Sequence, residues 1–488
     1  MSSSESKTPK SPLVARVLNG TLWQGGALLF ANASSFLAKL ILARLLVPEY
    51  FGLVAMAVVF TGLIQTLEDL GINSALVQRE ESDLTDTDLY TGARAYLIVG
   101  IASYFLIILP GAPLVSWFYG EPQLIPIILA LGIPILFKPF CLNQAVTLNR
   151  ALKFKELARI QMVATFIAAI LAVGLAFAGA GVWAIVAQWI ASSAIKVGLL
   201  VALYDGPPKA EFCWDSLKRI LSYGLSVTGQ RAFTMISNQG DYLILGKMLG
   251  ASALGAYSLA FLITDSIRGK LMSVMGTVLF PAYSKLQNDL VKLNEYYIAS
   301  VRFNTLVVIP VICASMVYPE QIILYGFGEE WLEAVAPLRL LALAALIHTI
   351  AGTNSQALKA VNRPDIGFKI KGVVSVGFFL PTLIIATYFY GLIGAAWAVI
   401  GAKTLERIAF HVALRRVIGT REWDILKALI PSVIAGSSMT IVLYILQWQW
   451  PIESLWQLLF FLILGGLVYL AAALPLVWRE LMSLRSKS

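Results

Sequence analysis

The sequence has little charge for its length. Only 13% of its 488 residues are Asp, Glu, Lys or Arg, whereas 58% are apolar, and the mean hydropathy is +0.77. A soluble domain has about a quarter of its residues charged, and it needs them to face water. The shortage of charge therefore excludes a soluble globular protein and indicates a polytopic membrane protein.

Cysteine and histidine are also scarce. The three cysteines, Cys141, Cys213 and Cys313, are far apart and form no CxxC pair, and the two histidines are His348 and His411. A disulfide framework or a Cys and His metal site needs closely spaced ligands of these types. We therefore expect small buried thiols and no metal site.

Enzyme and nucleotide motifs are missing as well. The sequence has no GxxxxGK[ST], GxSxG or HExxH pattern, and its largest polar loops, near 79–89, 205–216 and 282–294, are short. A fused ATPase, glycosyltransferase or receptor domain is thereby excluded. We expect no enzyme and no cofactor.

What the sequence has in abundance is long apolar runs. A membrane-spanning helix needs about 20 predominantly apolar residues, and about fourteen such runs are present. The fold class expected is therefore all-α and polytopic. The first and seventh runs are the richest in small and polar residues. The expected helices are 18–43, 50–76, 90–115, 123–148, 159–179, 182–204, 217–246, 251–280, 295–318, 332–358, 367–388, 391–414, 425–446 and 455–477.

The loops alternate in charge. The formal net charge is +9, and Lys and Arg gather in every second loop and in both tails, whereas 118–123, 389–394 and 447–456 have none. Cytoplasmic loops carry the excess of Lys and Arg in membrane proteins. The alternation indicates an even number of helices with both termini in the cytoplasm, and it explains the basic charge without nucleic acid. The short polar N-terminus does not fit a cleaved signal peptide.

One stretch occurs twice. LILARLLVPEYFGLVAMA at 40–57 aligns without gaps with LILGKMLGASALGAYSLA at 243–260, at a constant offset of 203 (243 − 40). Six expected helices separate the copies, so both halves have the same orientation, as in transporters with parallel repeats. We expect two six-helix lobes and two accessory helices. The expected parts are an N-terminal tail (1–17), an N-lobe (18–204), a cytoplasmic linker (205–216), a C-lobe (217–414), accessory helices (425–477) and a C-terminal tail (478–488).

Each copy of the repeat places a cation at the end of a helix. Arg44 and Lys247 occupy matching positions, and Pro48 follows where the next helix can begin. A Lys or Arg near a helix C-terminus at the membrane surface reaches phosphates or water and suits the helix dipole. We expect Arg44 and Lys247 to be interface anchors at a tight outer hairpin.

Ionisable residues also occur deep inside the expected helices, where they are costly and mark interior cavities. Two interpretations compete. Close pairs such as Asp265 with Arg268 and Lys403 with Glu406 neutralise each other structurally, and Lys196, His348 and Glu68 reach an interface or pack on neighbouring helices. Alternatively, the cations line a water-filled cavity that suits an anionic cargo. The candidate cavity cations are Lys39, Lys138, Arg231, Arg268, Lys403 and Arg407, and the candidate coupling acids are Asp241, Asp265 and Glu406.

Several longer segments resemble a known family. LARLLVPEYFGLVAMAVVF and LEDLGINSALVQRE within 42–80, LFPAYSKLQNDLVKL at 279–293, FGEEWLEAVAPLRLLAL at 327–343 and QALKAVNRPD at 356–365 resemble the polysaccharide-transport branch of the multidrug/oligosaccharidyl-lipid/polysaccharide exporter superfamily. The pattern is most similar to the colanic-acid-type lipopolysaccharide and exopolysaccharide flippases and covers nearly all of the chain.

The resemblance implies a bacterial inner-membrane protein that carries undecaprenyl-diphosphate-linked oligosaccharide units to the periplasmic face. It implies coupling to a proton or sodium ion, two six-helix lobes with alternating access, and membrane lipids as surroundings. It leaves open a polysaccharide polymerase and a chain-length regulator as partners. Two alternatives remain: a cation-coupled multidrug antiporter of the same superfamily, and a membrane component of polymer assembly that transports nothing.

Overall fold

The computed structural model describes residues 30, 33–79, 84–151, 153–206, 210–350 and 352–485. These residues are almost entirely helical, in agreement with the expected all-α class. Eleven of the described helices are long and apolar enough to cross a membrane. They account for twelve of the fourteen expected helices, because Pro364–Ile418 combines the eleventh and twelfth. The first expected helix (18–43) lies largely outside the described residues. The seventh (217–246) is helical within Trp214–Lys285, but the span counted there is Gln239–Asp265.

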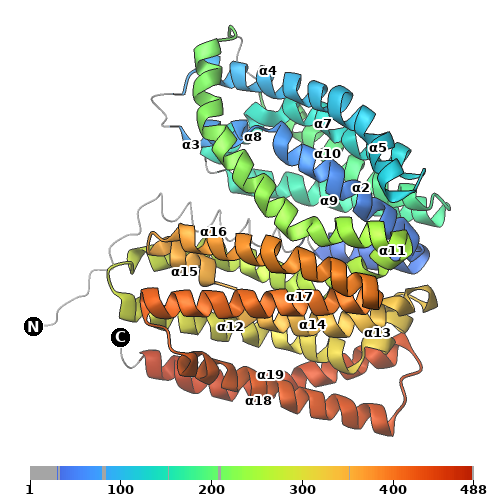
Figure 1. Ribbon diagram of the computed structural model, residues 1–488, viewed down its shortest axis with the longest axis vertical. Coiled ribbons are helices and arrows are strands. Elements are labelled where there is room, and N and C mark those ends of the chain that lie inside the picture. The colour runs from blue at the N-terminus through green and yellow to red at the C-terminus, as the bar shows by residue number, and fades with distance from the viewer. Residues whose placement is uncertain are drawn as a thin grey trace, which may run out of the picture. The chain divides into compact units, whose positions relative to one another are not determined.

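The chain divides into two compact units (Figure 1). Unit 1 comprises Met1–Leu46 and Leu53–Gln239, and unit 2 comprises Val47–Gly52 and Gly240–Ser488. The division falls inside the helix expected to open the C-lobe, not in the linker 205–216. By its contacts within the fold, the segment from Trp214 to Gln239 belongs to unit 1. The bounds of the two expected lobes stay a prediction.

Unit 1 contains the helices that precede the linker. Residues 33–45 form the described part of the first helix. The further elements are α2 (Pro48–Glu68), α3 (Ile72–Gln78), α4 (Asp86–Ser103), η1 (Tyr104–Ile108), α5 (Leu109–Tyr119), α6 (Leu124–Gly132), α7 (Pro134–Phe137), η2 (Lys138–Cys141), α8 (Leu142–Arg150), α9 (Phe154–Phe177), α10 (Val182–Leu203) and the first part of α11 (Trp214–Lys285).

Unit 2 contains the remainder of α11 and the helices after it. Its helix α12 packs between α14 and α18, and α19 lies beside α18 (Figure 1). Its elements after α11 are α12 (Leu290–Val317), α13 (Pro319–Gly326), η3 (Glu329–Ala334), α14 (Val335–Ile350), α15 (Asn354–Ala360), α16 (Pro364–Gly372), η4 (Val373–Phe379), α17 (Leu380–Ile418), α18 (Glu422–Gln449) and α19 (Leu455–Arg485).

Glycines divide two of the long helical runs. Gly250 inside α11 and Gly391 inside α17 have φ of 83° and 56°, which only glycine adopts without strain. These breaks lie between 246 and 251 and between 388 and 391, where the hydropathy pattern separates two helices. The hydropathy pattern therefore separates the helices where the backbone breaks, and α11 and α17 each consist of two helices joined at a kink.

The expected single helix at 50–76 is wrong in one respect. The backbone leaves helical geometry after Glu68, because Leu70 and Gly71 have φ of 44° and 67°, and α3 then starts at Ile72. Left-handed backbone is costly for Leu, so the surrounding structure must hold it there. Glu68 and Asp69 thus lie at the end of a helix and not in its middle.

The two copies of the repeated stretch meet inside unit 2. A Cβ on Gly52 would lie 1.8 Å from the carbonyl oxygen of Ala251, and a Cβ on Gly255 would lie 1.9 Å from that of Pro48. Gly52 matches Gly255, and Pro48 matches Ala251, at the same offset of 203. The contact is therefore reciprocal, as a two-fold relation between two copies requires. Glycine occupies both positions because the two backbones touch there.

Candidate functional site

Unit 1 contains a cavity of about 550 Å³ lined by residues 33–45, α2, α6, α7, η2, α9 and α10. Lys39, Lys138 and Lys196 contribute three ammonium groups to its wall. Ser35 and Lys39 lie four residues apart, on one face of their helix. Uncharged polar side chains complete the lining: Ser35, Thr61, Gln65, Gln161, Thr165, Gln188, Ser192 and Ser193.

A second cavity of about 520 Å³ adjoins the first. Gln65, Lys138, Ser193 and Lys196 line both cavities. The second also reaches Arg231, which the sequence predicted, and two acids. The residues that line only this second cavity include Glu68, Asp69, Asn73, Tyr96 and Arg231.

Lys138 is held at the wall by local backbone geometry. Pro134 and Pro139 interrupt the helical run between α6 and α8, and Lys138 begins the 3₁₀ turn η2. Its Nζ donates a hydrogen bond of 2.7 Å to Oε1 of Gln65, whose Nε2 donates to the Leu131 carbonyl at 3.3 Å. A proline in a helix interior removes a backbone hydrogen bond and redirects the chain, which here turns the lysine toward α2.

Glu68 is a cavity residue for which the sequence suggested mainly packing. It is 1% exposed, and the hydroxyl of Tyr96 donates to its Oε1 at 3.2 Å. Its Oε2 has no hydrogen-bond partner among the described residues. Buried carboxyl oxygens are nearly always partnered, so this oxygen makes Glu68 a candidate for a contact that the described residues do not supply. In the sequence, the two adjacent acids of LEDLG at 67–71, shortly before a glycine, could have indicated that the helix ends here and that Glu68 has a special role.

Arg231 extends from α11 toward the break between α2 and α3. Its guanidinium donates to Oδ2 of Asp69 at 3.1 Å and to the hydroxyl of Ser74 at 2.8 Å, and its side chain is 47% exposed. The two cavities of unit 1 thus present four cations, Lys39, Lys138, Lys196 and Arg231, and two acids, Glu68 and Asp69. With every group ionised, the wall carries a net charge of +2 (4 − 2).

The candidate cations of unit 2 are paired. Arg268 contacts Asp265 through two nitrogens, with Nε donating to Oδ1 at 2.8 Å, and Lys403 Nζ donates to Glu406 Oε2 at 3.2 Å. Arg268, Asp265, Lys403 and His348 line a cavity of about 20 Å³, roughly the room of one water molecule. The pairing interpretation given above holds for both pairs, and direct contact of these cations with a cargo stays a prediction.

Arg407 lies elsewhere. It donates to Glu422 Oε1 at 2.7 Å, and His411 Nε2 contacts Oε2 of the same carboxylate at 2.7 Å. These bonds join α17 to α18, and Arg407 lines none of the three cavities described above. The structure therefore gives Arg407 a partner in the accessory helices, and its place at a cavity that binds cargo stays a prediction.

The acid Asp241 is buried in unit 2 and well satisfied. The hydroxyl of Tyr257 donates to its Oδ2 and the amide of Tyr242 to its Oδ1, both at 3.0 Å. Arg231 and Asp241 belong to different units, although both lie in α11. The expected anchors Arg44 and Lys247 are both exposed.

Comparison with known proteins identifies the family. Residues 41–336 match the family described as "Polysaccharide biosynthesis protein". The chain belongs to this family. It is 25% identical over 410 residues to "Lipopolysaccharide biosynthesis protein WzxC" of Escherichia coli (strain K12), covering 83% of this chain and 82% of the relative. It is 27% identical to "Succinoglycan biosynthesis transport protein ExoT" of Rhizobium meliloti (strain 1021), covering 70% and 69%.

Solved structures give the fold. The lipid II flippase MurJ in an inward closed conformation superposes with a TM-score of 0.73 at 17% identity, covering 94% of this chain and all of MurJ. An inward-facing multidrug transporter of the MATE family superposes with a TM-score of 0.61 at 17% identity, covering 80% and 94%. The expected fold class and family are therefore confirmed. The chain is a multi-pass membrane protein of a polysaccharide-biosynthesis transporter family and not an enzyme.

Proposed function

We propose that this protein translocates undecaprenyl-diphosphate-linked oligosaccharide units across a bacterial inner membrane by alternating access, for lipopolysaccharide or exopolysaccharide synthesis. Both termini face the cytoplasm in this proposal. The observation that carries it is the charge of the unit 1 cavities, where four cations surround only two acids. Phosphate oxygens form strong charge-assisted bonds with ammonium and guanidinium groups, so this wall suits a diphosphate.

The uncharged lining supports a sugar cargo. Gln161, Gln188 and Ser192 line the first cavity together with other hydroxyl and amide side chains. Such groups both donate and accept hydrogen bonds, as sugar hydroxyls require. The lipid tail would stay in the membrane while the head group passes the cations. Asp241, Asp265 and Glu406 remain the candidates for coupling to a proton or sodium ion.

A multidrug antiporter of the same superfamily is the second candidate. A cationic drug favours an acidic cavity, and the net charge of +2 opposes it. The MATE-like fold alone does not decide between the two, since one fold serves several functions. Cells that express the protein are expected to gain no resistance to cationic dyes, and a clear gain of resistance would favour this second function.

Arg231→Ala tests the flippase proposal in a strain whose polymer export depends on this protein. A charge-assisted hydrogen bond contributes about 1.5–3 kcal/mol, so export should fall about tenfold or more. Arg363→Ala is the matched control, because Arg363 is also half-exposed and paired with an aspartate, Asp365, at 3.2 Å. Normal export by Arg231→Ala at a normal protein level would contradict the role of Arg231.

A further inference from the structure

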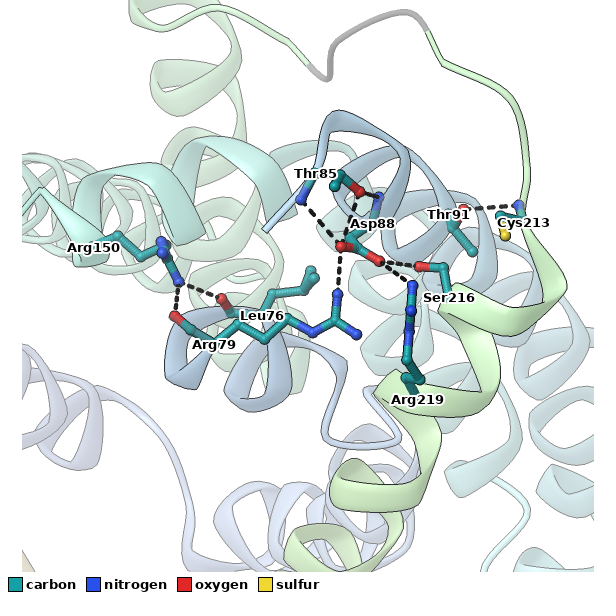
Figure 2. A network of polar contacts seen from close by, with 9 residues as sticks. All are labelled: Leu76, Arg79, Thr85, Asp88, Thr91, Arg150, Cys213, Ser216 and Arg219. Carbon is teal, nitrogen blue, oxygen red and sulfur yellow. Dashed lines mark hydrogen bonds and ion pairs between the residues drawn. The ribbon is translucent and has the colours of Figure 1, made fainter. Parts of the chain in front are cut away.

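The carboxylate of Asp88 is buried at the N-terminal end of α4. It is 0% exposed, and it accepts hydrogen bonds from the amide of Thr85 at 3.1 Å and from the Thr85 hydroxyl at 3.0 Å (Figure 2). The Thr85 hydroxyl in turn accepts from the amide of Asp88, which completes a capping box. A capping box alone accounts for neither the burial nor the further partners of this carboxylate.

Those further partners come from two other segments. Arg79, at the end of α3, donates to Oδ2 of Asp88, and the hydroxyl of Ser216, in the first turn of α11, donates to Oδ1 (Figure 2). The guanidinium of Arg219, one turn further along α11, lies 3.7 Å from Oδ1. Asp88 therefore joins the start of α4, the end of α3 and the start of α11.

Neighbouring bonds hold the same segments. The amide of Cys213 donates to the hydroxyl of Thr91 at 3.1 Å, which ties the entry of α11 to α4 a second time. Arg150, at the end of α8, donates to the carbonyls of Leu76 at 3.0 Å and Arg79 at 2.6 Å (Figure 2). These bonds satisfy carbonyls at the C-terminus of α3 and fix the segment that presents Arg79.

Beyond these bonds, α11 is attached to unit 1 by a narrow stripe. Ser216, Ile220, Gly224 and Thr228 are buried at every fourth position, and most of the residues between them are exposed or half-buried. Ile220 packs in a buried apolar cluster with α3, α4 and α8, Leu217 lies against that cluster, and the other three residues of the stripe are small. A Cβ on Gly224 would lie 2.1 Å from the carbonyl oxygen of Leu70, so the stripe fits only one register.

Arg231 continues this attachment into the cavity. It lies fifteen residues after Ser216 (231 − 216), a rise of about 22 Å along a helix. The Gly224–Leu70 contact and the bonds of the first turn both hold α11, and a rigid helix transmits a shift of that turn along its axis toward Arg231, which meets Asp69 and Ser74. A loosened first turn would move the cation relative to the cavity wall.

We propose that Asp88 is a positioning residue for transport: it anchors the first turn of α11 to α4 and thereby holds Arg231 at the cavity. The link to transport rests on the proposed function, because it requires Arg231 to contact a diphosphate. The anchoring itself does not depend on that function.

Cys213 is a native reporter of the anchor. With Cys141→Ala and Cys313→Ala, it is the sole thiol of the chain. In permeabilised membranes, Asp88→Asn should raise the labelling rate of Cys213 by a charged maleimide about tenfold, because removing one partner of a buried ion pair strongly favours local opening. Ser216→Ala, which removes one hydrogen bond and suits a helix, should raise it several-fold. Unchanged labelling in both variants would overturn the anchor.

Binding of farnesyl diphosphate to the purified full-length protein tests the link to Arg231. Asp88→Asn should weaken binding several-fold when Arg231 is present and have no further effect in an Arg231→Ala background. An equal loss in both backgrounds would show a general structural effect and overturn the positioning role. If Asp88→Asn does not accumulate, Asp88→Asn with Arg79→Gln removes both buried charges, and Ser216→Ala provides the same comparison.

The two proposals fail differently. If Arg231→Ala leaves the affinity for farnesyl diphosphate unchanged, the proposed function loses its main support and Asp88 has no diphosphate contact to position. The labelling rate of Cys213 still decides whether Asp88 anchors α11. If binding depends on Arg231 but not on Asp88, the flippase proposal stands and the positioning role is overturned.

Discussion

At the scale of single residues, the cavity cations of unit 1 come from four separate elements. Lys39 belongs to residues 33–45, Lys138 to η2, Lys196 to α10 and Arg231 to α11. Helical spacing relates side chains only within one helix, so it places Ser35 beside Lys39 but cannot relate Lys138 to Lys196. Their shared cavity wall explains why a membrane protein keeps costly charges at these positions.

Lys138 offers a test at this scale. Lys138→Met keeps the length of the side chain and removes the ammonium group that binds Gln65. The partner of Lys138 is the neutral amide of Gln65 at the cavity wall, so the substitution breaks no ion pair among the described residues and the protein should accumulate normally. Loss of a charge-assisted contact of about 1.5–3 kcal/mol should lower polymer export about tenfold or more.

The control for this test is Lys138→Arg, which keeps the positive charge and should retain part of the export. Export is measured per amount of membrane-inserted protein on immunoblots. Full export by Lys138→Met would remove Lys138 from the candidate binding residues.

At the scale of elements, glycine decides where helices break and where they touch. The hairpin before α2 begins its helix at Pro48, as the sequence predicts, and Gly52 one turn later touches Ala251 of the second copy. The sequence indicated a repeat through identical residues at a constant offset between 40–57 and 243–260. It could not indicate that the two copies pack on each other, because alignment contains no distances.

This contact predicts a stability effect. Gly52→Ala and Gly255→Ala each place a methyl group against a backbone carbonyl, and overpacking of this kind costs about 1–3 kcal/mol. Both variants should lower the thermal unfolding midpoint of the purified protein in detergent.

Gly174→Ala is the control, because Gly174 lies inside α9 with no atom within 4 Å of an added Cβ. Alanine is a better helix former than glycine, so this variant should be neutral or slightly stabilising. Equal midpoints for Gly52→Ala and Gly174→Ala would argue against a tight contact at the hairpin.

At the scale of the whole molecule, the chain belongs to a polysaccharide-biosynthesis transporter family, and under the proposed function the charge of the unit 1 cavities favours an anionic cargo. The accessory helices have a structural link to unit 2, since Glu422 of α18 binds both Arg407 and His411 of α17. That link gives Arg407 a role in helix packing, whatever its contact with a cargo.

Reconstitution tests the molecule as a whole. In liposomes, the purified protein should flip a fluorescent polyprenyl-diphosphate sugar and leave a fluorescent zwitterionic phospholipid unflipped, because only the first carries the diphosphate that the cations attract. Accessibility of the label to an external quencher measures the flipping. No flipping of either lipid by folded protein, with or without an ion gradient, would favour a component of polymer assembly that transports nothing.

The sequence by itself determined the membrane class, the order of the helices, the hairpin at Pro48 and the presence of a repeat. These follow from hydropathy and local spacing, because the bilayer demands long apolar helices whatever their partners are. Only the tertiary structure decided which charges share a wall. It placed Lys196 and Glu68 at the cavities and paired Arg407 with Glu422. It also brought Arg79, Asp88 and Ser216 into one cluster. A charge in a helix reveals that a partner is needed, whereas its partner is chosen by the packing of segments far apart in the chain.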